Sequence, residues 1–184
     1  MFIENKNYSY KGIQFTIRSA IKSDAERLSE VRYIIDGETE NMDRVQGENY
    51  LSTSDFISII KIDEQSAHNL FLVALIDDQI VGFSRCEGIS LARFAHKVEF
   101  GLAVLQDYWG FSIGYNLLKE SVHWADSANI KKITLNVTEN NVNAIKLYKK
   151  FNFIEEGLLR HEKLLADGVY HHTVLMGRIN NVHK

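Results

Sequence analysis

Apolar and polar side chains alternate along residues 97–104, KVEFGLAV, and this period predicts a β-strand with two different faces. The alternation stops in LQDYWGFSIGYNLL, after which apolar side chains recur on one face of a helix expected at 112–127. A second strand, KKITLNV, follows at 131–137. A strand, a helix and a strand in this order predict two neighbouring parallel strands.

The N-terminal third predicts a further strand and two more helices. IQFTIRS at 13–19 alternates and is expected to be the first core strand, after an extension at 1–12 that can add an edge strand. A capping box from Ser23 to Glu26 predicts the start of a helix. A shorter helix is expected at 52–61, where apolar residues share a face.

Two hairpins complete the expected sheet. The first joins LFLVALID and QIVGFSRC over Asp77 and Asp78, and the second turns at Asp167–Gly168, a pair favoured in two-residue turns. No repeat or linker divides the chain. We therefore predict a single-domain α/β fold with a mixed sheet of about seven strands flanked by helices.

The composition excludes several classes of protein. The 184 residues carry a net charge of −3 with dispersed lysines and arginines, which argues against a nucleic-acid partner. No stretch approaches the ~20 apolar residues of a membrane span, and the polar N-terminus has no signal-peptide core. We expect a cytoplasmic protein without a membrane partner, and a single cysteine, Cys86, agrees with a reducing compartment.

Seven histidines raise the question of a metal site. His171 and His172 are adjacent on an expected strand, so their side chains point to opposite faces and cannot chelate one ion together. The chain also lacks an H-E-x-x-H motif and a cysteine pair. No metal is expected, and Cys86 is expected to be a small buried side chain rather than a nucleophile.

The turn between the 97–104 strand and the next helix has the chemistry of an anion site. Gly110 and Gly114 flank Ser112 where the helix begins. The first amides of a helix lack backbone partners and the helix dipole is positive there, so a phosphate group binds well. The pyrophosphate of a nucleotide cofactor fits this description, although glycines before a helix can also be plain turn residues.

The segment NNVNAIKLYKKFNF predicts a helix that Asn141 begins, with Ala144 and Ile145 on its inner face and Tyr148 two turns along the same side. Together with the glycine loop and the closing segment EEGLLRHEKLLADGVYHHTVLMGRI, it resembles the GNAT superfamily of acetyl-CoA-dependent N-acetyltransferases. The resemblance is closest to the bacterial spermidine and ribosomal-protein acetyltransferase branches.

This resemblance covers residues 13–179, which we take as the domain, between the 1–12 extension and a 180–184 tail. It implies a V-shaped sheet, in which the two parallel strands splay apart at their C-terminal ends. The pantetheine arm of acetyl-CoA is expected to lie in that gap.

The resemblance also implies which residues bind acetyl-CoA. The strand segment expected to hold the pantetheine is Leu102, Ala103 and Val104. The loop expected to hold the pyrophosphate is Trp109, Gly110, Phe111, Ser112, Ile113, Gly114 and Tyr115. The side chains expected to flank the cofactor are Asn136, Asn141 and Ala144. The loop departs from the family pattern, because Trp109 replaces an Arg or Gln and Ser112 replaces the middle glycine. Asn141 is equally well explained as a helix cap.

Acetyl transfer to an amine needs a neutral amine, a polarised carbonyl and a stabilised thiolate. Glu99 is the candidate base, on the strand face opposite Val98 and Phe100; alternatively it pairs with a lysine or arginine. Tyr148 is the candidate acid, whose hydroxyl donates to the sulfur; alternatively it is a core tyrosine whose hydroxyl meets water.

The acceptor is poorly specified. Acidic residues exceed basic ones in 30–64, which in this family covers the acceptor side of the cleft, and such an excess either attracts a polyamine or another cationic amine or forms a solvated surface. The acids are Glu30, Asp36, Glu38, Glu40, Asp43, Glu48, Asp55, Asp63 and Glu64, against Arg32, Arg44 and Lys61.

Three functions stay open: acetylation of a small amine, acetylation of a protein N-terminus, and acyl-CoA binding without turnover. The first two differ in whether the segment 36–65 closes the cleft or leaves a peptide groove. A homodimer is a further possibility.

Overall fold

The alternating segments form eight strands in the part of the chain that the structure, a computed structural model, describes: residues 2–180. The strands are β1 (Lys6–Tyr10), β2 (Ile13–Ser19), β3 (Leu70–Ile76), β4 (Gln79–Gly88), β5 (Lys97–Val104), β6 (Lys132–Thr138), β7 (Ile154–Leu164) and β8 (Tyr170–Ile179). The helices of at least nine residues are α1 (Ala25–Glu38), α2 (Thr53–Gln65), α3 (Ile113–Ser127) and α4 (Val142–Lys150). Most of the predicted tail at 180–184 lies outside the described residues.

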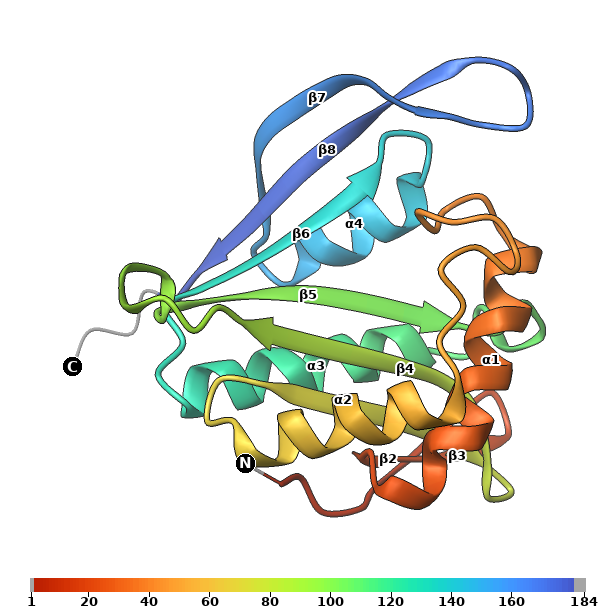
Figure 1. Ribbon diagram of the computed structural model, residues 1–184, viewed down its shortest axis with the longest axis vertical. Helices are drawn as coiled ribbons and strands as arrows, with labels where there is room; N and C mark the ends of the chain where they lie inside the picture. The colour runs from red at the N-terminus through yellow and green to blue at the C-terminus, as the bar shows by residue number, and fades with distance from the viewer. Residues whose placement is uncertain (1, 181–184) are drawn as a thin grey trace.

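These strands form one mixed sheet in the order β1-β2-β3-β4-β5-β6-β8-β7 (Figure 1). The α/β class is confirmed. The sheet has one strand more than the predicted seven because the N-terminal extension supplies β1, which pairs with β2 at the edge.

The sheet opens between its two parallel strands. β5 and β6 pair over three residues only, from Lys97–Lys132 to Glu99–Thr134, although both strands continue well beyond. Figure 1 shows the two strands diverging from there. The predicted V shape is thereby confirmed, and from Phe100 onward β5 has a strand partner on one side only, β4.

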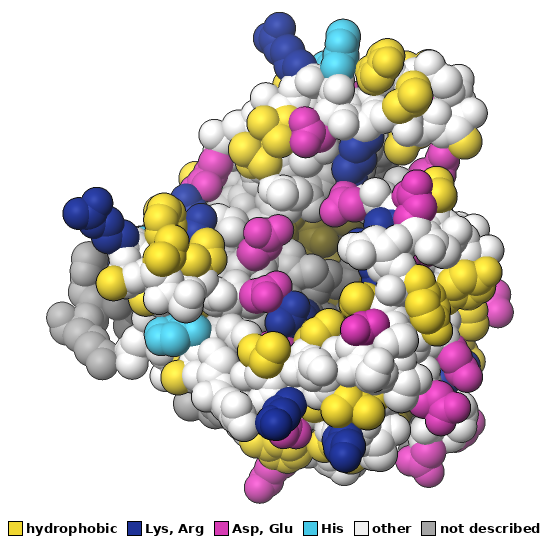
Figure 2. Space-filling view, viewed as in Figure 1, with side chains coloured by type: hydrophobic (Ala, Val, Ile, Leu, Met, Phe, Trp, Pro, Cys, Tyr) yellow, Lys and Arg dark blue, Asp and Glu magenta, His cyan; other side chains and the backbone are white. Residues whose placement is uncertain are grey.

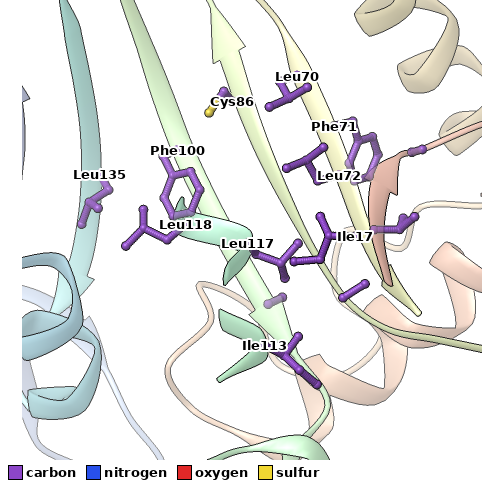
Figure 3. Packing of buried hydrophobic residues seen from close by; sticks show 14 of the residues in the cluster. Ile17, Leu70, Phe71, Leu72, Cys86, Phe100, Ile113, Leu117, Leu118 and Leu135 are labelled. Carbon is purple, nitrogen blue, oxygen red and sulfur yellow. The ribbon is translucent and has the colours of Figure 1, made fainter. Parts of the chain in front are cut away.

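The helices cover both faces of the sheet. On β4, Ser84 lies 3.1 Å from Ser121 of α3, whereas the next residue, Arg85, pairs with Asp63 of α2. Because successive strand residues point to opposite faces, α3 and α2 lie on opposite sides of the sheet. Figure 3 shows the α3 side, where Leu118 lies beside Phe100 of β5 in the hydrophobic core.

The start of α1 differs from the prediction. The capping box from Ser23 to Glu26 is wrong: Asp24 fills this role, accepting a 2.8 Å hydrogen bond from the Ile21 amide. Arg18 holds the same carboxylate with two hydrogen bonds of 2.7 and 2.9 Å. Asp24 thus closes the short turn at 22–24 just before α1 and is held there by Arg18, a residue of β2.

The second predicted helix begins as expected and ends later. Ser52 and Asp55 form a capping box at the start of α2, which then runs to Gln65 rather than to residue 61. The added turn contains Asp63, whose carboxylate is buried against Arg85. That tertiary ion pair lies beyond what the local apolar pattern can indicate.

The two hairpins differ in their turns. Asp77 and Asp78 form the predicted two-residue turn, both with positive φ. The predicted two-residue turn at Asp167–Gly168 is wrong, because residues 166–168 form a three-residue loop in which the Gly168 amide donates to Leu165 O at 3.0 Å. Gly168 has a φ of 75°, the left-handed conformation that glycine adopts readily after such a turn.

Candidate active site

Two clefts adjoin where β5 and β6 part. The loop cleft lies between the 108–115 segment, β5 and α4, and has a volume of about 610 Å³. The charged pocket, of about 250 Å³, lies between α1, the 41–44 segment, and the strands β4, β5 and β6. Figure 2 shows a hollow near the centre of this face, with acidic and basic side chains around it. The clefts share Ile35, Asn41, Met42, Leu102, Ala103, Asn141 and Tyr148.

The loop cleft meets the N-terminus of α3. Gly110 and Ser112 have φ angles of 81° and 62°, and the first residue of the helix is Ile113. The first helical hydrogen bond runs from the Asn116 amide to Ser112 O, so the amides just before Asn116 have no preceding turn to pair with. These amides and the positive end of the dipole make this cleft suitable for a phosphate group.

Trp109 secures this loop to the neighbouring strand. Its indole Nε1 donates a 2.7 Å hydrogen bond to Val104 O, although the side chain is 46% exposed. The family's arginine or glutamine at this position would carry a polar end group toward a ligand. Here the indole N–H is occupied by the backbone of β5, so its contribution is to loop geometry.

Most of the predicted cofactor residues lie around the loop cleft. Those that line it are Leu102, Ala103, Val104, Trp109, Gly110, Ser112, Ile113, Gly114, Tyr115, Asn141 and Ala144. Phe111 instead packs against the hydrophobic core, and Asn136 lines only the charged pocket. Asn141 is a helix cap as well, since its Oδ1 accepts from the Ala144 amide at 3.3 Å.

Segments distant in sequence contribute residues that the motifs do not indicate. α1 and the loop after it provide Ile35, Thr39, Asn41 and Met42 to the loop cleft, and Arg32, Asp36, Asp43 and Arg44 to the charged pocket. Their sequence pattern is that of an ordinary helix and an acidic loop. No spacing signal indicates the four residues of the loop cleft, whereas the four of the charged pocket belong to the 30–64 segment that the resemblance places on the acceptor side.

Tyr148 lies at the junction, because it lines both clefts. Its ring packs against Phe100 and Phe153, with ring centroids 6.4 and 5.8 Å away. Burial raises the pKa of Tyr148 to about 12, so the hydroxyl is protonated at neutral pH. Within residues 2–180 this hydroxyl has no hydrogen-bond partner, which leaves it free to donate to a ligand.

Glu99 lies at the point where β5 and β6 stop pairing, and it lines the charged pocket. The alternative of an ion pair with a lysine or arginine is not found among the described residues. The carboxylate is therefore exposed in the pocket and available to accept a proton.

The acidic excess at 30–64 is largely used inside the fold. Four of its carboxylates form ion pairs: Glu30 with Arg27, Asp36 with Arg44, Asp63 with Arg85, and Asp43 with Lys163. Glu38, Glu40, Glu48 and Asp55 each accept a hydrogen bond from a backbone amide. Most carboxylates of this segment are therefore already paired and do not form a free surface that attracts cations. Several of these contacts attach the segment to other parts of the molecule.

The remaining candidate groups have structural surroundings. His171 lies 2.9 Å from Asp167, and His172 Nδ1 accepts from the His161 amide at 3.1 Å. No group of three or more metal-ligating side chains occurs within residues 2–180. Cys86 is buried as predicted, and burial raises the pKa of its thiol to about 12. None of the helices in the described part of the chain is both long and apolar enough to cross a membrane.

Splayed parallel strands, a helix N-terminus ready for pyrophosphate and a buried tyrosine between two clefts together define an acyl-coenzyme A type of site. The chain belongs to the acetyltransferase (GNAT) family, which it matches over residues 35–153. This is a class of acetyltransferases that use acetyl-CoA as co-substrate.

Individual relatives agree with the family. The chain is 38% identical over 109 residues to an N-alpha-acetyltransferase of Sulfolobus acidocaldarius, a match that takes in 53% of this chain and 62% of that protein. It is 30% identical to an L-amino acid N-acetyltransferase of Escherichia coli, over 59% of this chain and 67% of that protein. An acetyltransferase of the GNAT family from Streptococcus pneumoniae has the same fold, with a TM-score of 0.87 at 23% identity, over 90% of this chain and 99% of that one. The spermidine and ribosomal-protein branches stay a prediction.

Proposed function

We propose that the chain transfers the acetyl group of acetyl-CoA to the primary amine of a small molecule, by direct attack in a ternary complex. The observation that carries this proposal is the meeting of two clefts at Tyr148, with Glu99 in the smaller one. One cleft has the chemistry of a cofactor site and the other can take an acceptor, so both substrates would meet beside an acid and a base.

On the cofactor side, the amides from Gly110 to Gly114 would bind the pyrophosphate. The edge of β5 that β4 leaves unpaired would bind the amide groups of pantetheine at 102–104, except at Val104 O, which already accepts from Trp109. Acetyl-CoA supplies the acetyl group as a thioester.

On the acceptor side, Glu99 removes a proton from the ammonium group, directly or through water, and frees the nitrogen lone pair for attack on the thioester carbon. A carbon–nitrogen bond forms, the carbon–sulfur bond breaks, and the second proton of the nitrogen passes to the departing thiolate or to solvent. Tyr148 donates a hydrogen bond to the departing sulfur. The pKa of Tyr148, about 12, is well above the pKa of a thiol, roughly 8.5. Tyr148 therefore stabilises the thiolate by a hydrogen bond and keeps its own proton.

The segment after α1 favours a small acceptor over a peptide. Glu40 accepts a 2.7 Å hydrogen bond from the Ala166 amide, and Asp43 forms a 2.6 Å ion pair with Lys163. These bonds hold the 40–43 loop, which lines the charged pocket, against the β7–β8 hairpin, and this supports a closed acceptor cleft rather than an open peptide groove. A protein N-terminus is the second candidate, favoured by the similarity to an N-alpha-acetyltransferase.

Other sequence predictions stay predictions: the 13–179 domain boundaries, the cytoplasmic location, the homodimer and the cofactor role of each loop residue.

The test is an acetyl-CoA-dependent thiol-release assay over four groups of acceptor: polyamines, amino acids, aminoglycosides and short peptides with free N-termini. We expect release with a small amine and weaker release with peptides. Release with peptides alone would replace the small-amine function by the second candidate. Calorimetric binding of acetyl-CoA without release on any amine would instead indicate an acyl-CoA-binding module.

A further inference from the structure

We propose that the charged pocket selects an acceptor that carries a carboxylate beside its amine, with Arg32 and Arg44 binding the carboxylate and Glu99 facing the amine. This inference rests on the proposed function, for which it names the class of acceptor.

The first observation is an excess of positive charge at the α1 side of the pocket. Arg44 holds Asp36 with two hydrogen bonds of 3.2 and 3.0 Å, and this carboxylate is only 3% exposed. Arg32 lies 4.0 Å from the same carboxylate and donates to Asn49 O at 2.8 Å. Two guanidinium groups therefore share one carboxylate, which leaves one positive charge without a counter-ion there.

The second observation is that each of the two guanidinium groups has an N–H group without a hydrogen-bond acceptor among the described residues. Arg32 Nη2 and Arg44 Nη1 form no hydrogen bond with any residue from 2 to 180. Burial, followed by the nearby charge of Arg44, lowers the pKa of Arg32. An added anion would stabilise the charged form of such a guanidinium group. The paired N–H donors of two adjacent guanidinium groups match the planar carboxylate geometrically.

The strand side of the pocket has the opposite charge. Arg85 is paired with both Asp63, at 2.7 Å, and Glu87, at 2.9 Å, so its charge is more than balanced. Glu99 lies directly opposite Glu87 in the β4–β5 register and has no partner among the described residues. An ammonium group is favoured at this side, where the base of the proposed reaction lies.

The charged pocket is therefore dipolar, positive toward α1 and negative toward β4 and β5. A polyamine would bring a second ammonium group near Arg32 and Arg44, which is repulsive. A peptide N-terminus would present an uncharged amide where the arginines favour an anion. An α-amino acid has both charges, and a volume of about 250 Å³ suits a molecule of that size.

The decisive experiment uses the unaltered protein and matched acceptors. Thiol release from acetyl-CoA is measured with each of the common L-amino acids and with its carboxamide, which keeps the amine and removes the negative charge, and with spermidine. We expect kcat/KM for the best amino acid to exceed that for its amide by at least about tenfold, mostly through KM. An amide that equals its acid, or a preference for spermidine or a peptide, would overturn the inference.

Variants then assign the selectivity to the arginines. Arg32→Gln and Arg44→Gln should bring the ratio of acid to amide close to one, with little change for the amide. Arg44→Gln leaves the buried Asp36 carboxylate with Arg32 alone, 4.0 Å away, so if this variant folds poorly the assignment is tested by Arg32→Gln, which keeps the Arg44–Asp36 pair. Arg160→Gln, at an exposed position of β7, is the control and should keep the ratio of the unaltered protein. A ratio that is unchanged in folded Arg32→Gln and Arg44→Gln would contradict the assignment.

A binding measurement separates this inference from the proposed function. If no amine is acetylated, the proposed function fails, and the CoA-bound protein is titrated with amino acids and their amides by calorimetry. Binding of the acid alone would support the carboxylate site in a non-catalytic protein. Equal binding of both, or binding of neither, would overturn the site as well.

Discussion

The loop cleft and the charged pocket share seven lining residues and differ in what they are made of. The loop cleft presents backbone: the amides at the start of α3 and the free edge of β5. The charged pocket presents side chains, with Arg32, Arg44 and Glu99 from separate segments. A backbone site suits a ligand that is the same in every member of a family, whereas a side-chain site can change its ligand by substitution.

Removing the Tyr148 hydroxyl, at the boundary of the two clefts, should have the largest effect. In the proposed mechanism this group contacts the sulfur most strongly as the thiolate forms, so Tyr148→Phe should lower kcat by about 10²-fold or more. Affinity for acetyl-CoA, measured by calorimetry, should be nearly unchanged. Tyr170→Phe, an exposed tyrosine on β8, is the control. Unaltered turnover in Tyr148→Phe would remove this residue from the mechanism.

Glu99→Gln tests the charged pocket, which is made of side chains. It should lower kcat/KM by about 10²-fold at neutral pH. The loss should shrink as the pH rises and more of the amine is already neutral, which a merely structural role would not produce. The rate is measured across the pH range for one accepted amine. Glu162→Gln, exposed on β7, serves as the matched control. A pH-independent loss would argue against the base role.

Gly114→Val tests the loop cleft, which is made of backbone groups. A β-carbon at residue 114 would lie 3.4 Å from Leu102 and 4.0 Å from Val104, which is ordinary contact, so the fold should tolerate it. Toward the loop cleft, the valine side chain would keep a phosphate group away from the amides at the start of α3. We expect acetyl-CoA to bind at least about tenfold more weakly. His123→Val, a similar change at an exposed position of α3, controls for the branched side chain. Equal calorimetric affinity of folded Gly114→Val and the unaltered protein would refute this site.

Cys86 on β4 points away from the charged pocket and should affect stability alone. In the unfolded chain its thiol ionises near pH 9, whereas burial raises the folded pKa to about 12. The protonated folded form is therefore fully stabilising below about pH 9, and this contribution is lost as the pH rises from 9 to 12. By pH 10 the loss is on the order of 1 kcal/mol. Denaturant unfolding between pH 8 and 10 should show a flatter pH dependence for Cys86→Ala, and identical slopes would be evidence against the prediction.

Ser112→Gly should have the smallest effect and sharpens the comparison. Ser112 has a φ of 62°, costly for serine and neutral for glycine, and its side chain does not cap α3. If the loop cleft binds through backbone, losing this hydroxyl should change acetyl-CoA affinity by less than about threefold while raising the melting temperature slightly. A large loss of affinity would mean that the side chain contacts the cofactor.

Local sequence accounts well for the loop cleft. Alternation at 97–104 and glycines around Ser112 occur within twenty residues of one another, and both depend on backbone rules that any chain obeys. Tyr148 is a candidate from the family resemblance together with a local pattern, because its helix and the cap at Asn141 are both local. Phe111 packs against the core rather than lining the cleft, since an aromatic side chain gains free energy when its surface is removed from water.

The charged pocket was decided only by the tertiary structure. From the sequence, the acids at 30–64 either attract a cation or form a solvated surface, but Arg44, Arg85 and Lys163 neutralise three of them. Two of these bases come from distant strands. Asp24, paired with Arg18, likewise takes the place of the predicted Glu26 as the acid of the capping box before α1. A helix or strand forms from the periodicity of its own residues, whereas the charge that a pocket presents depends on which partners the fold brings within a few ångströms, and no local pattern records that distance.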